Sequence, residues 1–219
     1  MKVLEAGEAY RLWAPTYSEE TVISFLDDEL AHELSPPLEG KRLLDAGCGT
    51  GRRLVGNGAA LSVGVDLSRE MLTSGSMRSV AVADVCNLPF ADNSFDVVWC
   101  RLVLGHLRDP RPAYHELARV CRPGGVMFVS DFHAAAVAAG HRRSFRDRAG
   151  HEYAIEHHVY DAASHQKMAE KAGLSLKARR DGVIGTSVEN FYERAGKQFI
   201  FERDHGLPVV AAFLFERAG

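Results

Sequence analysis

Residues 43–51 read Leu43-Leu44-Asp45-Ala46-Gly47-Cys48-Gly49-Thr50-Gly51, an apolar run that breaks into three alternating glycines. Glycine is needed where the backbone takes a positive φ angle or where a ligand approaches the main chain closely. A strand that ends in such a turn, with a helix expected after it, is typical of the cofactor-binding edge of an open α/β sheet. We therefore predict a strand over residues 42–48 and a ligand site in the turn.

Further apolar runs predict strands on both sides of intervening helical segments. Such alternation indicates an α/β fold with a mostly parallel sheet covered by helices on both faces. The predicted strands after the turn are 61–67, 79–85, 95–100, 126–132, 174–184 and 208–215. The predicted helices are an amphipathic one over 18–34 and others over 112–120, 162–172 and 188–198.

The length of 219 residues fits a single domain, which we divide into four parts. Residues 1–40 form an N-terminal helical cap, 41–132 the cofactor-binding core, and 162–219 the C-terminal part of the sheet. Residues 133–161, between the cofactor-binding core and the C-terminal part, are polar and fit no regular crossover connection between two strands. Long loops of this kind are often functional, so we predict an acceptor-side insertion over the active-site end of the sheet.

The composition of the chain limits which binding partners and which cellular location we expect. A net charge of -3 argues against a nucleic-acid partner, since such proteins usually carry a basic surplus. The four cysteines form no C-x-x-C pair and are interpreted as reduced thiols. No targeting segment and no apolar stretch of membrane-spanning length is found, so we expect a cytoplasmic monomer or homodimer that acts on a small molecule.

Two cofactor classes compete for the glycine turn. Dinucleotide enzymes use G-x-G-x-x-G, whose last glycine would fall at position 52, where this chain has Arg52. Asp45, two residues before the first glycine, would repel a pyrophosphate but could accept a hydrogen bond from an ammonium group. S-adenosylmethionine carries an amino group and no phosphate, so the pattern favours it over NAD.

Two further acids end the next two predicted strands. Asp66 lies about 20 residues beyond the turn, where an acid can accept the ribose hydroxyls. Asp84 is placed to receive the adenine amino group. Either acid alone could be an ordinary turn or helix-capping residue. Three acids at the ends of three successive strands, together with the turn, indicate a nucleoside-containing cofactor.

Four stretches together resemble the successive motifs of class I S-adenosylmethionine-dependent methyltransferases. They are LLDAGCGTGR, VGVDLSREML, ADVCNLPFADNSFDVVWC and RVCRPGGVMFVSDF, within residues 43–132. The likeness is to the small-molecule group that contains the quinone-biosynthesis and malonyl-carrier-protein methyltransferases. The segment YRLWAPTY resembles the N-terminal segment of that group.

The resemblance implies a Rossmann-like seven-stranded sheet of order 3-2-1-4-5-7-6 with an antiparallel last strand. It implies that Tyr10 and Tyr17 close over the methionine end of S-adenosylmethionine. His106 falls in the family's pattern after the fourth strand, as a packing residue or as a cofactor contact. The short stretch 68–75 leaves little room for the second helix. The cofactor-binding residues implied are Tyr10, Tyr17, Asp45, Gly47, Gly49, Asp66, Leu67, Asp84, Val85 and Leu102.

Residues that handle the acceptor are expected in or after the insertion, which is rich in histidine. Histidine titrates near neutral pH and can serve as a general base for a hydroxyl acceptor. The candidates are His133, His157, His158 and Tyr160, although polar insertions also collect surface histidines. Four arginines of the same stretch could bind an acidic or phenolic acceptor or form a solvated arm. They are Arg142, Arg143, Arg146 and Arg148.

The predicted reaction is transfer of a methyl group from S-adenosylmethionine to oxygen, nitrogen or carbon of a small molecule by in-line displacement. A methyl on a sulfonium needs no metal, and the histidine spacing matches no metal motif. Most of the catalysis would then lie in positioning the nucleophile. Two alternatives stay open: a non-catalytic regulator that binds S-adenosylmethionine, and an NAD(P)-dependent oxidoreductase.

Overall fold

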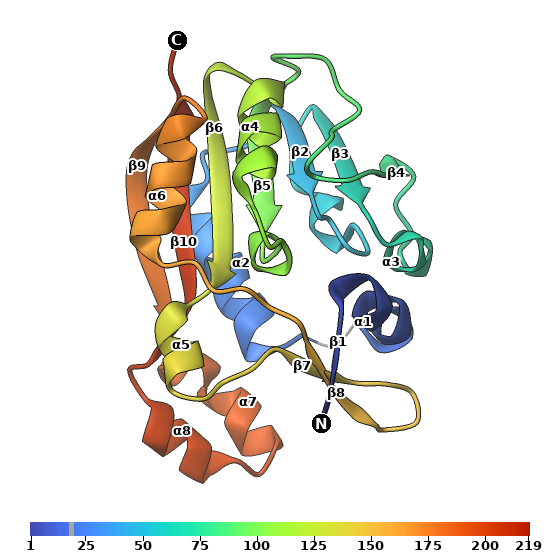
Figure 1. Ribbon diagram of the computed structural model, residues 1–219, viewed down its shortest axis with the longest axis vertical. Helices are drawn as coiled ribbons and strands as arrows, with labels where there is room; N and C mark the ends of the chain where they lie inside the picture. The colour runs from blue at the N-terminus through green and yellow to red at the C-terminus, as the bar shows by residue number, and fades with distance from the viewer. Residues whose placement is uncertain (18–19) are drawn as a thin grey trace.

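The predicted strands form one seven-stranded sheet in the order β4-β3-β2-β5-β6-β10-β9 (Figure 1). The computed structural model describes residues 1–17 and 20–219. Strand β10 is antiparallel to both of its neighbours, so the predicted sheet order is confirmed. The strands are β2 (Arg42–Ala46), β3 (Leu61–Asp66), β4 (Val80–Val82), β5 (Phe95–Arg101), β6 (Cys121–Phe132), β9 (Leu174–Val183) and β10 (Pro208–Arg217).

Helices pack on both faces of the sheet. Successive side chains of a strand point to opposite faces, so a strand contributes apolar residues to the core on either side. In β6, Met127 and Val129 pack into one core with α4 (Arg111–Val120) and α6 (Ala162–Lys171). Phe128, between them in the sequence, packs into a second core with α2 (Val22–Leu34) on the other face. The position of α2 behind the sheet and of α4 and α6 in front is visible in Figure 1.

Helix α2 corresponds to the amphipathic helix predicted over 18–34. It begins after Thr21, whose hydroxyl accepts from the Ser24 amide while the Ser24 hydroxyl accepts from the Thr21 amide. This reciprocal cap sets the first turn. The first two residues of the predicted range, 18 and 19, lie outside the described residues.

Two predicted helices differ in the structure. The helix expected after the glycine turn is only a 3-10 turn at Arg52–Leu54, because Gly56 and Gly58 follow with positive φ angles of 64° and 80°. The helix predicted over 188–198 is divided into α7 (Glu189–Arg194) and α8 (Gln198–Asp204), with Gly196 at φ 62° between them. The remaining 3-10 turns are Ala14–Thr16, Leu104–His106 and Thr186–Val188.

The boundaries of two strands differ from the predicted ones, and one helix is short, as predicted. Strand β4 is shorter than the predicted 79–85. Strand β6 begins earlier than residue 126, because Cys121 already pairs with Phe95 at the start of β5. Helix α3 (Arg69–Ser74) is as short as the stretch 68–75 led us to expect.

Residues 133–161 contain regular structure that the sequence pattern did not reveal. They form α5 (Ala134–Ala138), β7 (Ser144–Arg146) and β8 (Glu152–Ile155). Strand β8 pairs with β7 and with β1 (Lys2–Leu4), which leads into α1 (Ala6–Trp13). The sequence pattern does not reveal these strands, because β8 pairs with a strand at the other end of the sequence. In Figure 1 this small sheet and α1 lie beyond the carboxyl ends of β2, β3 and β5.

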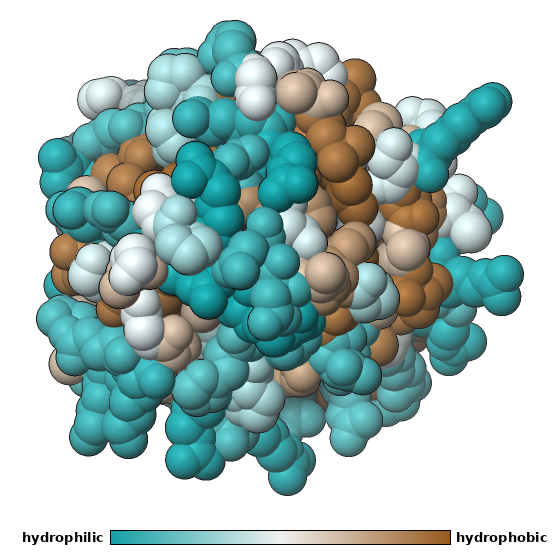
Figure 2. Space-filling view, turned by 90° about the horizontal axis from the view of Figure 1, so that it is seen from above, coloured by the Kyte–Doolittle hydropathy of each residue, from teal (hydrophilic) through white to brown (hydrophobic). Residues whose placement is uncertain are grey.

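The end of the molecule opposite the cavity is formed by the amino ends of the parallel strands. Figure 2 looks down on the amino ends of the parallel strands and shows a mainly hydrophilic surface with hydrophobic residues in smaller patches.

Among the described residues, the structure contains no helix with the length and apolar composition needed to cross a membrane.

Candidate active site

A cavity of about 250 Å³ lies at the carboxyl ends of the parallel strands, beneath α1. Its walls come from the loops after β2, β3, β4 and β5 and from the N-terminal segment, which is where an open α/β sheet binds its ligand. Nine of the ten predicted cofactor-binding residues line it: Tyr10, Tyr17, Gly47, Gly49, Asp66, Leu67, Asp84, Val85 and Leu102.

The glycine turn has a backbone that side chains would not allow. Gly47 and Gly49 have φ angles of 83° and 59°. A Cβ atom on Gly47 would lie 2.2 Å from Cγ2 of Val103, so any larger residue would displace the opposite wall. The Gly47 and Cys48 amides both donate to the Val65 carbonyl oxygen, at 2.7 and 2.9 Å, which ties the turn to β3. The turn is thus a fixed cradle made of main chain.

Asp66 joins the turn to the end of β3. Its two carboxylate oxygens accept from the Gly49 and Ser68 amides, each at 2.8 Å. Each oxygen retains a lone pair for a ligand hydroxyl. Burial raises the pKa of Asp66, and the two amide hydrogen bonds oppose that shift.

The other two predicted acids differ in exposure. Asp84 is exposed on the wall and accepts from the Cys86 amide at 2.8 Å, so it also serves as a turn acid. Asp45 is fully buried behind the wall, and neither of its oxygens has a hydrogen-bond partner among the described residues. Burial raises the pKa of Asp45 to about 6, against the opposing charges of Arg53 and Arg101.

Leu102 has an unusual backbone at the end of β5. Its φ angle is 60°, a conformation that bulky residues rarely adopt and that is often found at functional sites. The Leu102 amide donates to the Ser130 carbonyl oxygen at 2.9 Å, and its own carbonyl oxygen accepts from Arg143 Nη1 at 3.1 Å. These two bonds hold the strained residue on the cavity wall.

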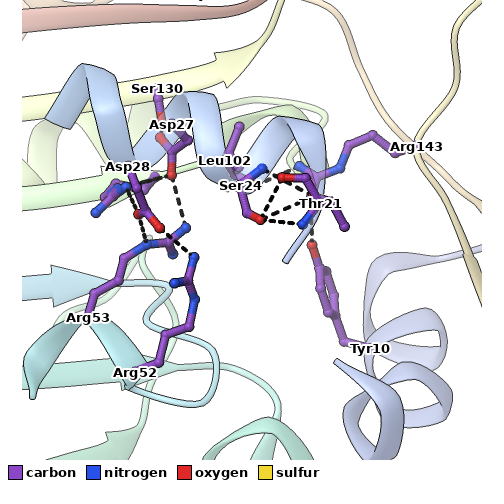
Figure 3. Close-up of polar contacts among 11 residues, drawn as sticks. Tyr10, Thr21, Ser24, Asp27, Asp28, Arg52, Arg53, Leu102, Ser130 and Arg143 are labelled. Atoms are coloured by element: carbon purple, nitrogen blue, oxygen red, sulfur yellow. Dashed lines mark hydrogen bonds and ion pairs between the residues drawn. The ribbon is translucent and has the colours of Figure 1, made fainter. Parts of the chain in front are cut away.

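Tyr10, His106 and Arg143 meet on the same wall, from three distant segments. The Tyr10 hydroxyl lies 3.0 Å from His106 Nε2, and Arg143 Nη2 donates to that hydroxyl at 3.3 Å (Figure 3 shows Tyr10 and Arg143). Burial and the Arg143 charge lower the pKa of His106 to about 3, whereas burial raises the pKa of Tyr10. His106 is therefore neutral and can accept a hydrogen bond.

Behind the cavity, a buried network of charges connects α2 to the sheet (Figure 3). Arg101 donates to Asp27 at 2.8 Å through Nη2, and Arg53 donates to Asp27 at 3.0 Å and to Asp28 at 2.9 Å. Burial raises the pKa of Asp28, but the charges of Arg53 and Arg101 outweigh it and hold the value at about 2. Both arginines also line the cavity.

Comparison with known proteins identifies the family of the chain. Residues 44–129 match the family model described as a methyltransferase domain. Demethylmenaquinone methyltransferase of Corynebacterium urealyticum is 39% identical over 123 residues, 51% of this chain and 52% of that protein. Ubiquinone biosynthesis O-methyltransferase of Thiobacillus denitrificans is 31% identical over 175 residues, 67% of this chain and 74% of that protein. The chain belongs to the S-adenosylmethionine-dependent methyltransferase family.

A solved structure supports the fold. An S-adenosylmethionine-dependent methyltransferase from Mesorhizobium loti superposes with a TM-score of 0.66 at 19% identity, over 90% of this chain and 98% of that one. The chain spans about half the length of the demethylmenaquinone methyltransferases that it matches. Family membership confirms S-adenosylmethionine as the predicted cofactor.

The residues present fit that cofactor. The main-chain cradle at Gly47 and Gly49 leaves room that side chains would fill. The carboxylate of Asp45 lacks any donor among the described residues and lies two residues before Gly47, as a partner for an ammonium group would.

The structure places none of the four predicted catalytic residues on the cavity wall. His133 caps α5, where its Nδ1 accepts from the Ala135 amide at 3.0 Å. His157 Nε2 lies 3.2 Å from Asp131 in the interior, and His158 Nε2 lies 3.8 Å from Glu156. The Tyr160 hydroxyl donates to the Leu107 carbonyl oxygen at 2.7 Å. All four thus have partners within the fold.

Two residues that lie on the wall, His106 and Arg143, are only weakly indicated by the sequence. The sequence is equally compatible with a packing role for His106 and with a solvated arm that contains Arg143. The signal for His106 was its place just after the fourth strand. Nothing in the sequence distinguishes Arg143 from Arg146 or Arg148, which are exposed in the structure.

Across residues 1–17 and 20–219, no group of three or more His, Cys, Asp or Glu side chains is arranged to hold a metal ion.

Proposed function

We propose that this protein transfers a methyl group from S-adenosylmethionine to oxygen, nitrogen or carbon of a small-molecule acceptor. The observation that carries the proposal is the single cavity in which nine predicted cofactor residues from five separate segments meet. The names of two relatives, a demethylmenaquinone methyltransferase and a ubiquinone biosynthesis O-methyltransferase, support a small-molecule acceptor, which we infer to be acidic or phenolic. The four free cysteines support a cytoplasmic location.

Different residues of the cavity would bind different parts of the cofactor. Gly47 and Gly49 would hold the methionine portion against main-chain atoms, and Asp66 would accept from the ribose hydroxyls. Asp84, with Val85 and Leu67 beside it, would border the adenine. The bound cofactor supplies an electrophilic methyl group on a sulfonium. Tyr10 and Tyr17, on the N-terminal segment, would cover the methionine end.

The chain itself contributes mainly orientation and exclusion of water. Tyr10 and Arg143 are held by hydrogen bonds to His106 and Leu102, so the wall beside the methionine end is built before any ligand binds. With a proton on Nδ1, which faces the Glu156 carbonyl oxygen at 3.4 Å, His106 presents Nε2 as an acceptor. Nε2 can therefore orient a hydroxyl of Tyr10 or of the acceptor.

A calorimetric comparison of two cofactors tests the proposal. We expect S-adenosylhomocysteine to bind with micromolar affinity and NADH not to bind. Asp66→Ala should weaken S-adenosylhomocysteine binding at least tenfold, because it removes the ribose acceptor and releases the Gly49 amide. Asp84→Ala, on the exposed part of the same wall, should have a smaller effect. NADH binding, or unchanged affinity in a folded Asp66→Ala protein, would refute the assignment.

A further inference from the structure

A second cavity of about 170 Å³ adjoins the cofactor cavity. The two share Tyr17, Leu102 and Arg143 as wall residues, so they meet at the strained end of β5. The second cavity is smaller than the cofactor cavity, so it suits a molecule smaller than S-adenosylmethionine.

The walls of the second cavity offer flat apolar surface. Trp13 and Phe132 contribute aromatic rings, and Ile23 contributes an aliphatic side chain. Trp13 is held by stacking on Phe145, with ring centroids 5.2 Å apart, and by an edge contact with Tyr17 at 4.7 Å. A side chain fixed in this way presents a rigid face to an aromatic ligand.

The charged groups on these walls are mostly positive. Arg52 is already paired with Asp28, outside the cavity, at 2.7 Å. Arg143 is half-buried, and its only hydrogen bonds in the described part of the chain go to a neutral carbonyl and a neutral hydroxyl. Arg142 has no hydrogen bond or ion pair among those residues. Within residues 1–17 and 20–219, Glu20 is the one acid that lines this cavity.

The histidine on the wall of the cofactor cavity, His106, does not favour an acceptor that must first lose a strongly held proton. Burial and the Arg143 charge keep the pKa of His106 at about 3, so it is a weak base. Efficient general bases have a pKa near the working pH. Arg143 instead provides a positive charge where the acceptor would enter, which favours a molecule that arrives already ionised.

We propose that the second cavity binds the acceptor, and that the acceptor is a small aromatic carboxylate whose anionic group is bound by Arg142 and Arg143 and whose ring lies against Trp13 and Phe132. Guanidinium groups bind carboxylates through paired, charge-assisted hydrogen bonds. The inference rests on the proposed function, since it takes the first cavity as the cofactor site. It assigns a ligand class to a cavity and to two arginines that otherwise lack an acidic partner in residues 1–17 and 20–219.

The test compares charged and neutral probes on protein saturated with S-adenosylhomocysteine. The probes are the three isomeric hydroxybenzoates and the matching hydroxybenzamides, titrated by calorimetry at low salt. We expect the carboxylates to bind at least tenfold more tightly than the amides, with a preference that weakens as salt is added. Equal affinity for the two series, or no binding of either, would overturn the proposal.

Three variants and one control test which arginines bind the carboxylate. Arg142→Gln and Arg143→Gln should each reduce the preference for carboxylates at least threefold, and the double variant should abolish it. Arg148→Gln, in the same segment but outside both cavities, should leave the preference unchanged. Arg142 makes no hydrogen bond within the described residues, so its variant should fold normally even if loss of the Arg143 contacts disturbs the wall. A full preference in the double variant would contradict the assignment.

Binding of S-adenosylhomocysteine separates the two proposals. If it fails to bind, the proposed function itself is wrong. If it binds and the protein does not discriminate carboxylates from amides, only the acceptor class is wrong.

Discussion

At the scale of single residues, Asp45 shows how a sequence position and its environment give different information. Its place before the first glycine predicts a partner for an ammonium group. The structure adds that the carboxylate is fully buried without a donor among the described residues, which no sequence pattern could show. An ionised carboxylate in that position lowers stability unless a ligand compensates for it.

This burial predicts a pH-dependent effect of Asp45→Asn. The pKa of about 6 in the folded protein exceeds the ordinary value of 3.8, so the folded state binds more protons between these values. The contribution of Asp45 to stability therefore falls as the pH rises from about 4 to 6, by on the order of 2–3 kcal/mol. Asn avoids that loss because it stays neutral.

Urea denaturation at pH 4 and pH 7.5 measures the effect. Asp45→Asn should match the native protein in free energy of unfolding at pH 4 and exceed it at pH 7.5. Its affinity for S-adenosylhomocysteine at pH 7.5 should fall, since the ammonium group loses a charged partner. A stability difference that is the same at both pH values would show that Asp45 does not titrate in this range.

At the scale of elements, the parallel core was predictable and its surroundings were not. Strands β2 and β5 are mostly apolar because most of their side chains are buried, β2 runs into the glycine turn, and β3 ends in Asp66. The small sheet was not predictable, since β8 pairs with residues at the start of the chain. The position of Arg143 on the cavity wall depends on that sheet, so it escaped prediction for the same reason.

Helix α2 is connected to the sheet by charges rather than by apolar contacts alone, which predicts a large effect of Asp27→Ala. Asp27 is fully buried and accepts from Arg53, Arg101 and Ser130. Removing it leaves Arg101, 4% exposed, without its main partner. Breaking a buried pair in this way costs about 3–5 kcal/mol.

Chemical denaturation tests this prediction, with Asp92→Ala as the matched control. Asp92 pairs with Arg119 at 2.8 Å, but its side chain is 67% exposed, so its loss should change stability by less than about 1 kcal/mol. Similar losses for the two variants would mean that the buried network adds little to the attachment of α2.

At the scale of the whole molecule, the cavity is covered by a part of the fold with its own small core. Four buried residues, Leu4, Ala9, Phe145 and Ile155, hold α1 and the small sheet together, separately from the two large cores on the sheet faces. Regions with few buried contacts open more readily than the central sheet. The N-terminal segment and residues 144–155 therefore form the cover through which ligands would enter.

This arrangement predicts where ligand binding will slow hydrogen exchange. Without ligand, amides of β1, β7 and β8 should exchange much faster than those of β5 and β6. S-adenosylhomocysteine should slow exchange in the small sheet at least tenfold, because Tyr10, Tyr17 and Arg143 connect that cover to the cavity wall. Leu4→Ala should speed exchange there and weaken binding, whereas Val3→Ala, at a 55% exposed position of the same strand, should do neither. If protection appears only in the glycine turn and β3, the cover does not close on the cofactor, and Tyr10 and Tyr17 contribute nothing to its retention.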